Sequence, residues 1–373
     1  MTTIAPPSLS FRLRRATLAG ACAVLSATVP TGCGGGAAGT PEPVVVSPPP
    51  PPVVVDPEPD FSAVTAEVER HPVADMALIV GNADGVLLSY EKGAFSTSDT
   101  VRIASSSKLL TGLAVWSLVE DGVLSETDRA GELLDEWSGT DARADVTLAD
   151  LMSFTSGLGT RVGEGTCAGD PRYTLSECVS EIHDGGLDFA PGEAFVYGPN
   201  HMQVAALMAE RASGRALSDV LREDILGPAG ASGDTGFGTS RNPRYSGGAS
   251  ATADDYARVL RALLAGELLA DSETFQRERS SGARIEAQPA GLDAAALDWR
   301  YGFGFWVECD AVPFTRDCAR EPTISSAGLF GFVPWIDTEA GYWGVIAMEE
   351  PGPNTESTEL QQILQPMIAD ALR

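Results

Sequence analysis

The chain has 373 residues and a formal net charge of −27, from 25 Lys and Arg residues against 52 Asp and Glu residues. So acidic a surface repels a phosphate backbone, and we therefore expect no nucleic-acid partner. Beyond residue 60, the mixed apolar and polar composition is that of one globular unit of roughly 300 residues, large enough to bury a substantial core.

The first 33 residues have the pattern of an export signal. Three arginines precede an uncharged apolar run over residues 16–29, and Thr31-Gly32-Cys33 follows it. A bilayer-spanning helix needs ~20 apolar residues, so this shorter run favours a signal peptide over a transmembrane anchor. The residues before Cys33 resemble a bacterial lipoprotein cleavage box, although Pro30 stands where that box usually has Leu. We predict that Cys33 is the lipidated first residue of the mature chain.

Residues 34–60 are rich in Pro and Gly, which favour an extended and semi-rigid conformation over helix or strand. This segment is expected to tether a domain over residues 61–373 to the lipid on Cys33. Removing the first 32 residues, which contain three arginines and no acidic residue, changes the net charge from −27 to −30. The sequence thus predicts an exported, membrane-anchored lipoprotein of the periplasm or cell surface.

Apolar periodicity predicts strands near both ends of the domain and helices in its middle. Residues 60–70 have helical spacing, and the run 76–80 before a turn at 82–85 predicts a hairpin. The other expected elements are helices over 105–120, 204–212 and 253–264, strands over 301–308, 329–335 and 342–348, and a last amphipathic helix over 360–368. This order predicts an α/β fold: an antiparallel sheet flanked by N- and C-terminal helices, with an inserted mostly helical subdomain.

The domain contains Cys167, Cys178, Cys309 and Cys318, which allow three disulfide connectivities. An oxidising compartment favours disulfides, and the two short spacings favour the local pairs Cys167–Cys178 and Cys309–Cys318. A zinc site is the alternative, but these spacings do not match the usual C-x-x-C knuckles. We therefore predict two local disulfides and no metal site.

Ser105 and Lys108 lie three residues apart at the start of the predicted helix over 105–120. On a helix this spacing places them on one face, where an amine can accept the hydroxyl proton. A capping serine beside a surface lysine is the simpler alternative. The chain, however, has two lysines against 23 arginines, so a solvated basic position would ordinarily be arginine, which cannot lose its proton. We predict that Ser105 is a nucleophile and Lys108 its proton acceptor.

Several segments occur in the order of a known family. Residues 103–108 (IASSSK) are followed by 151–158 (LMSFTSGL), by Tyr197 and by 247–255 (GGASATADD). Together they resemble the class C β-lactamase and esterase branch of the β-lactamase and penicillin-binding protein superfamily, and the similarity extends over residues 61–373. Phe154 stands where this family often has His. The resemblance implies a serine hydrolase domain that works without a cofactor.

The resemblance also assigns roles to the second motif, Y-x-N. Tyr197 matches its tyrosine, which lies beside the nucleophile and the lysine and relays protons. Pro199 takes the place of the asparagine, and Asn200, one residue later, is the candidate for the amide contact to substrate.

Ser326-Ala327-Gly328 fits the third motif, K-T-G or H-x-G, with a serine where a cation is usual. The resemblance implies that Ser326, Ala327 and Gly328 line the substrate cleft. It also implies that the N–H of Leu329 joins the N–H of Ser105 as the oxyanion hole.

The chain has three histidines, His71, His183 and His201, and it contains neither a G-x-S-x-G elbow nor an H-E-x-x-H motif. A Ser-His-Asp or zinc mechanism therefore has little support. His201 lies near Tyr197 in sequence, and we expect it at a surface position on a helix.

These patterns predict an exported serine hydrolase that acts on a small-molecule ester or amide through a covalent acyl-enzyme, with esters preferred. Two alternatives stay open. One is a β-lactamase or D-alanyl peptidase, and the other is a catalytically silent cell-surface binding module on the same fold.

Overall fold

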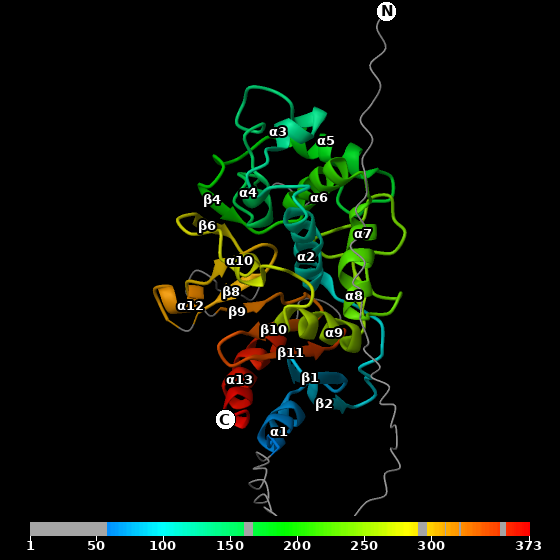
Figure 1. Cartoon of the computed structure of the whole chain (residues 1–373), viewed down its shortest axis with the longest axis vertical. Coiled ribbons are helices and arrows are strands. Elements are labelled where there is room, and N and C mark those ends of the chain that lie inside the picture. Colours follow the sequence, from blue (N-terminus) through cyan, green and yellow to red (C-terminus); the bar gives the residue numbers. More distant parts are fainter. Residues whose placement is uncertain (1–57, 160–166, 290–296, 310, 321, 351–355) are drawn as a thin grey trace, which may run out of the picture. The chain divides into compact units, whose positions relative to one another are not determined.

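The computed structural model describes residues 58–159, 167–289, 297–309, 311–320, 322–350 and 356–373. The predicted signal peptide, Cys33 and nearly all of the predicted tether lie outside the described residues. The division into signal, tether and domain therefore stays a prediction. Figure 1 labels the helices and strands.

Within the described residues, an antiparallel sheet of seven strands combines both ends of the domain. Its order is β2 (Val86–Lys92), β1 (Met76–Asn82), β11 (Tyr342–Ala347), β10 (Val333–Asp337), β9 (Thr323–Ser325), β8 (Trp306–Glu308) and β7 (Arg300–Tyr301). The pairing of β1 with β11 inserts the N-terminal hairpin beside the C-terminal strands. Two short pairs lie outside this sheet, β3 (Val101–Arg102) with β5 (Ser250–Ala251) and β4 (Ala194–Val196) with β6 (Arg284–Ala287).

The sheet is covered on both faces. Leu78 and Val80 pack with the terminal helices α1 (Ser62–Arg70) and α13 (Glu356–Ala371), which lie side by side in Figure 1. Ile79 points the other way, because side chains alternate along a strand, and it packs in the core of the helical part. The predicted antiparallel sheet with flanking terminal helices is confirmed.

Most of the helices lie between the two sets of strands, as predicted. They are the 3₁₀ turn η1 (Ala104–Ser106), α2 (Ser107–Glu120), α3 (Ala130–Leu133), the 3₁₀ turn η2 (Asp135–Trp137), α4 (Leu148–Met152), α5 (Leu175–Gly185), α6 (Asn200–Ser213), α7 (Leu217–Val220), the π-helical turn η4 (Leu221–Leu226), α8 (Gly227–Ala229), α9 (Ala253–Leu264) and α10 (Ser272–Phe275). The short helix α12 (Arg316–Arg320) lies between β8 and β9. Helix α9 packs directly on β1 and β11.

Two predicted strands differ from the structure, and glycine turns are the reason. The strand predicted over 301–308 is split into β7 and β8 by a turn that contains Gly304, whose φ is 96°. The strand predicted over 329–335 begins only at Val333, because the Gly328 N–H donates to the Phe332 carbonyl and closes a turn. A Cβ atom on Gly304 would lie 2.5 Å from the Lys108 carbonyl oxygen. The turn between β7 and β8 therefore needs glycine at this position, because a side chain would collide with the backbone of α2.

The structure joins Cys167 to Cys178 and Cys309 to Cys318, the two predicted pairs. A hydrogen bond holds the first disulfide in place: the Cys167 carbonyl accepts from Asn242 Nδ2 at 2.7 Å. This bond connects the disulfide to the segment that precedes β5.

We expect each disulfide to stabilise the fold by ~2–4 kcal/mol, because a cross-link restricts the unfolded chain. Peptide mapping without reduction, on protein taken from an oxidising compartment, is expected to recover both linked pairs. Urea unfolding of the Cys167→Ala/Cys178→Ala variant measures the loss in free energy of unfolding. Recovery of either local pair as unlinked peptides would refute the assignment.

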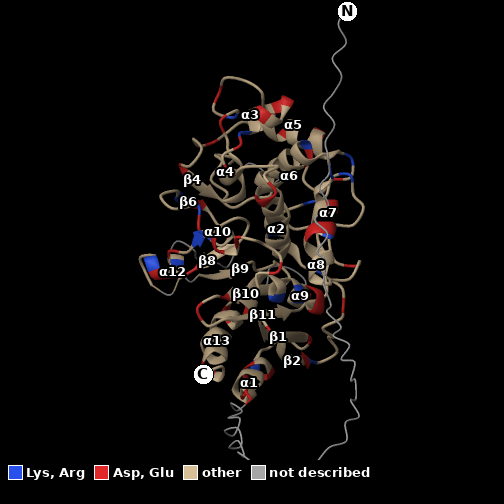
Figure 2. Ribbon diagram, in the orientation of Figure 1, with Lys and Arg blue, Asp and Glu red and all other residues tan. Residues whose placement is uncertain are grey.

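Acidic residues are distributed over both parts of the domain (Figure 2). Helix α1 carries Glu67 and Glu69, and η4 carries Glu223 and Asp224. Some pair with arginine, as Asp224 does with Arg215 at 2.7 Å, but surface pairs of this kind contribute at most about 1 kcal/mol. Among the helices of the described residues, none is long and apolar enough to cross a membrane.

Candidate active site

The candidate nucleophile, Ser105, lies in the turn η1 directly before α2. Ala104 has a left-handed φ of 43°, and the Ser107 hydroxyl donates to the Ala104 carbonyl at 2.6 Å. The Ser106 hydroxyl donates to the Ser326 carbonyl at 2.7 Å and so fastens the turn to the end of β9. Ser105 itself is partly exposed. The turn therefore holds one accessible hydroxyl in a strained, well-anchored backbone, as active sites often do.

Lys108 lies beneath this hydroxyl and is 3% exposed. Its Nζ lies 2.9 Å from Ser105 Oγ and donates to the Ser246 carbonyl at 2.6 Å. The same nitrogen lies 4.7 Å from the centre of the Tyr197 ring. Burial, and after it the positive charge of Arg244, hold the pKa of Lys108 well below its usual range. The lowered pKa favours the neutral amine, which is the form that can accept a proton from Ser105.

Buried side chains fix the carbonyl that binds Lys108. They hold the residue directly before it, Tyr245: Gln203 of α6 accepts the Tyr245 N–H at 3.0 Å, and Thr111 of α2 donates to the Tyr245 carbonyl at 2.7 Å. The sequence pattern does not point to Ser246, although it directly precedes the family segment 247–255. The acceptor for Lys108 is therefore held in place before any substrate binds.

Tyr197 reaches the same place from the end of β4. Its N–H donates to the Ala287 carbonyl of β6 at 2.9 Å. Its ring packs edge-on against Phe154 and parallel to Trp306, with centroid distances of 5.3 and 6.1 Å. Burial raises the pKa of Tyr197 to about 12, against a hydrogen bond with the Ser105 side chain that lowers it. Tyr197 therefore keeps its proton at neutral pH and is suited to relay protons.

The third-motif residues lie beside the nucleophile, with different surroundings. Ser326 is 3% exposed, and its hydroxyl donates to the Ser105 carbonyl at 3.1 Å. Ala327 packs toward the core between the sheet and the terminal helices, whereas Gly328 lies against the turn before Ser105. Leu329 is 46% exposed, and its N–H has no hydrogen-bond partner within the described part of the chain. That N–H is therefore available to a substrate oxygen.

A family model for beta-lactamase matches residues 62–365, a range that contains all of these side chains. The chain belongs to the beta-lactamase family. Members of this family are serine hydrolases of the β-lactamase/transpeptidase-like fold, which agrees with the sheet and the helical part described above.

Curated relatives match over part of their length. The chain is 29% identical to Penicillin-binding protein 4* of Bacillus subtilis over 144 residues, which are 38% of this chain and 31% of that protein. It is 27% identical to Lovastatin esterase of Penicillium rubens over 165 residues, 39% of this chain and 41% of that protein. The matched segments thus span less than half of either relative.

Solved structures match more fully. A Bacteroides dorei protein provisionally named a beta-lactamase superposes with a TM-score of 0.70 at 24% identity, over 83% of this chain and 99% of that one. EstCE1, a hydrolase with promiscuous acyltransferase activity, superposes with a TM-score of 0.63 at 17% identity, over 83% and 96%. At these identities, the likeness establishes the shared fold.

Two residues near Tyr197 are buried at the start of α6. Asn200 is its first residue and is 7% exposed, and its contact to substrate stays a prediction. The expected surface position of His201 is wrong, since its side chain is 1% exposed. The reason is that every residue from 200 to 209 of this helix is buried, so α6 is covered on all sides and not on one face. Burial also lowers the pKa of His201 to about 3.

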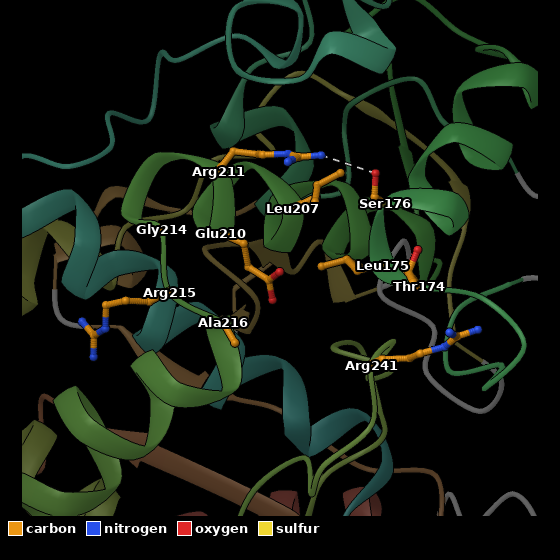
Figure 3. A pocket seen from close by; sticks show the side chains of 10 residues that line it. All are labelled: Thr174, Leu175, Ser176, Leu207, Glu210, Arg211, Gly214, Arg215, Ala216 and Arg241. Carbon is orange, nitrogen blue, oxygen red and sulfur yellow. Dashed lines mark hydrogen bonds between the residues drawn. The ribbon is translucent and has the colours of Figure 1, made fainter.

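A cavity of about 360 Å³ lies away from these residues, between α5 and the segment that joins α6 to α7 (Figure 3). None of the three site residues Ser105, Lys108 and Tyr197 lines this cavity. Glu210 connects its wall to the site, because its carboxylate accepts the Tyr245 hydroxyl at 3.1 Å. Within the described ranges, no cluster of three His, Cys, Asp or Glu side chains is placed to hold a metal ion.

Proposed function

We propose that the protein is a serine hydrolase that cleaves a carboxylic ester or amide through a covalent acyl-enzyme on Ser105, with esters preferred. One observation carries the proposal: the buried Lys108 Nζ, with its lowered pKa, lies 2.9 Å from the Ser105 hydroxyl. Burying an amine without a partner of opposite charge lowers the stability of the fold. A role as the base that activates the nucleophile explains why a buried lysine is present here.

In the proposed acylation step, Ser105 Oγ attacks the carbonyl carbon while its proton passes to the neutral Lys108 Nζ. The N–H groups of Ser105 and Leu329 stabilise the negative charge on the former carbonyl oxygen. As the bond to the leaving group breaks, the Tyr197 hydroxyl donates its proton to the departing oxygen or nitrogen and regains one from the Lys108 ammonium. The alcohol or amine leaves, and Ser105 carries the acyl group. Water then attacks the acyl carbon, the bond from that carbon to Ser105 Oγ breaks, and the acid leaves while Oγ regains a proton.

A fluorophosphonate probe tests the proposal, because it bonds covalently to an activated serine. We expect labelling of the peptide that contains Ser105, and none in a folded Ser105→Ala variant. Hydrolysis of p-nitrophenyl esters is expected to disappear in the same variant. A folded wild-type protein that stays unlabelled would favour the alternative of a silent binding module at the cell surface.

We expect neutral esters to be hydrolysed about ten-fold better than β-lactams or D-alanyl-D-alanine peptides, which carry a carboxylate. Ser326 stands where the family has a cation, and its hydroxyl already donates to the Ser105 carbonyl. A charge-assisted hydrogen bond contributes ~1.5–3 kcal/mol and a neutral one ~0.5–1.5 kcal/mol, which accounts for the expected factor. The name Lovastatin esterase supports the ester reading, whereas the name Penicillin-binding protein 4* supports the alternative.

The measurement compares the specificity constants for p-nitrophenyl butyrate and nitrocefin, with Ser105→Ala as the background. Arg244, whose positive charge acts on Lys108, is the candidate for binding a substrate carboxylate in place of the cation that Ser326 replaces. The Arg244→Gln variant is therefore measured with both substrates as well. Equal or faster hydrolysis of nitrocefin would replace the esterase proposal with a β-lactamase. Release of D-alanine from a peptide at such a rate would favour a D-alanyl peptidase.

We also propose that the protein is exported and held at a membrane by a lipid on Cys33. The signal pattern, the box Thr31-Gly32-Cys33 and the two disulfides support this. Intact mass is expected to show a chain that begins at an acylated Cys33, and the protein is expected to partition with membranes. An unmodified N-terminus elsewhere, or a Cys33→Ser variant processed and localised like the wild type, would contradict the proposal.

A further inference from the structure

His201 is a buried ring that the proposed mechanism does not use. Its Nδ1 lies 2.9 Å from the Ser156 hydroxyl, and the ring also hydrogen-bonds to the backbone of Val196, the residue before Tyr197. Burial, with a smaller contribution from the charge of Lys108, lowers the pKa of His201 to about 3, so the ring is neutral. A neutral imidazole has one donor and one acceptor nitrogen, which suits a backbone carbonyl and a hydroxyl.

The backbone of Val196 is held from two sides. Its N–H donates to the Phe154 carbonyl at 2.9 Å, and the His201 ring bonds to its backbone from α6. Phe154 has a left-handed φ of 61°, and its ring lies 4.9 Å from His201 and 5.3 Å from Tyr197 between centroids. The His201 ring from α6 thus packs against Phe154, the residue that stands where the family often has histidine.

We infer that His201 is a positioning residue for Tyr197: by bridging Ser156 and the backbone of Val196, it holds the Tyr197 hydroxyl at Ser105. This inference rests on the proposed function, because it concerns the same reaction. The titratable groups around the ring are Lys108 of α2, Tyr197 and, across Phe154, Tyr301 of β7. A neutral ring in this place bonds to the backbone without placing a positive charge beside Lys108.

The test is a double-mutant cycle with p-nitrophenyl butyrate. His201→Phe is expected to lower kcat by about 10- to 100-fold with a smaller change in KM, because a misplacement of ~1 Å can cost ~10²-fold. In a Tyr197→Phe background, the same change is expected to have less than about a two-fold effect, because the positioned group is absent. His201→Gln retains a donor and an acceptor and is expected to recover part of kcat. His183→Gln, on α5, is the matched control and is expected to keep wild-type kcat.

A second variant keeps the inference testable if His201→Phe does not fold. Ser156→Ala removes one hydrogen bond of the bridge, and we expect it to lower kcat at least about three-fold, but only where Tyr197 is present. Losses of equal size with and without Tyr197 would overturn the positioning role while leaving the proposed function intact. Failure of wild-type Ser105 to react with a fluorophosphonate would overturn the proposed function itself.

Discussion

Lys108→Arg is expected to lower turnover nearly as much as Ser105→Ala, by about 10²–10⁴-fold, which is the usual cost of losing a general base. A guanidinium keeps its proton at any working pH and cannot accept one from Ser105. The space is also unsuitable, because Nζ lies between Ser105 Oγ at 2.9 Å and the Ser246 carbonyl oxygen at 2.6 Å. A planar and larger head group cannot make both contacts.

The measurement is steady-state hydrolysis of p-nitrophenyl butyrate, with circular dichroism to compare the folds of the variants. The matched control is Lys92→Arg, since the other lysine of the chain donates to the carbonyls of Val68, Glu69 and His71 on the far side of the sheet from Ser105. We expect it to keep turnover within about two-fold. If Lys108→Arg retains more than about a tenth of wild-type turnover, Lys108 is not the base.

Helices with local end signals are the elements that the sequence predicts best. The bounds expected for α9 coincide with those observed, and its first turn shows why: the Thr252 side chain accepts the Asp255 N–H. Such a cap depends on residues three apart, and it is visible in the sequence. The turn between β7 and β8 depends instead on Gly304 passing the backbone of Lys108, a contact between distant segments.

The residues of the candidate site also divide into those that local spacing predicts and those that depend on contacts between distant segments. Ser105 and Lys108 are three residues apart on one helical turn, so their spacing alone predicts that they meet. Tyr197 required the resemblance to a family, because nothing local connects it to Ser105. Ser246 lies 138 residues from Lys108 and contributes a backbone carbonyl, so its residue type carries no signal.

The error on His201 follows from the surroundings of α6. Polar residues at the start of a helix usually indicate an exposed face. Here His201 meets Ser156 at 2.9 Å, and Gln203 meets Asn242 at 3.0 Å, so buried polar side chains are satisfied by partners from other segments. Hydrophobic periodicity detects an apolar face, and it cannot detect a buried face that is polar but paired.

Gly328→Ala is expected to lower turnover by about 10²-fold, although it adds a single methyl group. The new Cβ would lie 2.2 Å from the Ile103 carbonyl oxygen and 3.0 Å from Ser106 Oγ. The first of these atoms belongs to the backbone two residues before Ser105, so it cannot rotate away as the end of a side chain can. Either the turn that carries Leu329 or the turn that carries Ser105 must move, and a shift of ~1 Å in either separates the nucleophile from the oxyanion donor.

Kinetics with p-nitrophenyl butyrate and urea unfolding together separate this effect from a loss of fold. Gly139→Ala is the control, because a Cβ there meets no atom within 4 Å, and we expect its turnover and stability to match the wild type. Gly328→Ala is expected to lose turnover even under conditions where unfolding shows it to be fully native. Because the predicted effect comes from close approach of Gly328 to Ile103, a native Gly328→Ala protein with more than about half of wild-type turnover would show that this approach does not hold Ser105 in place.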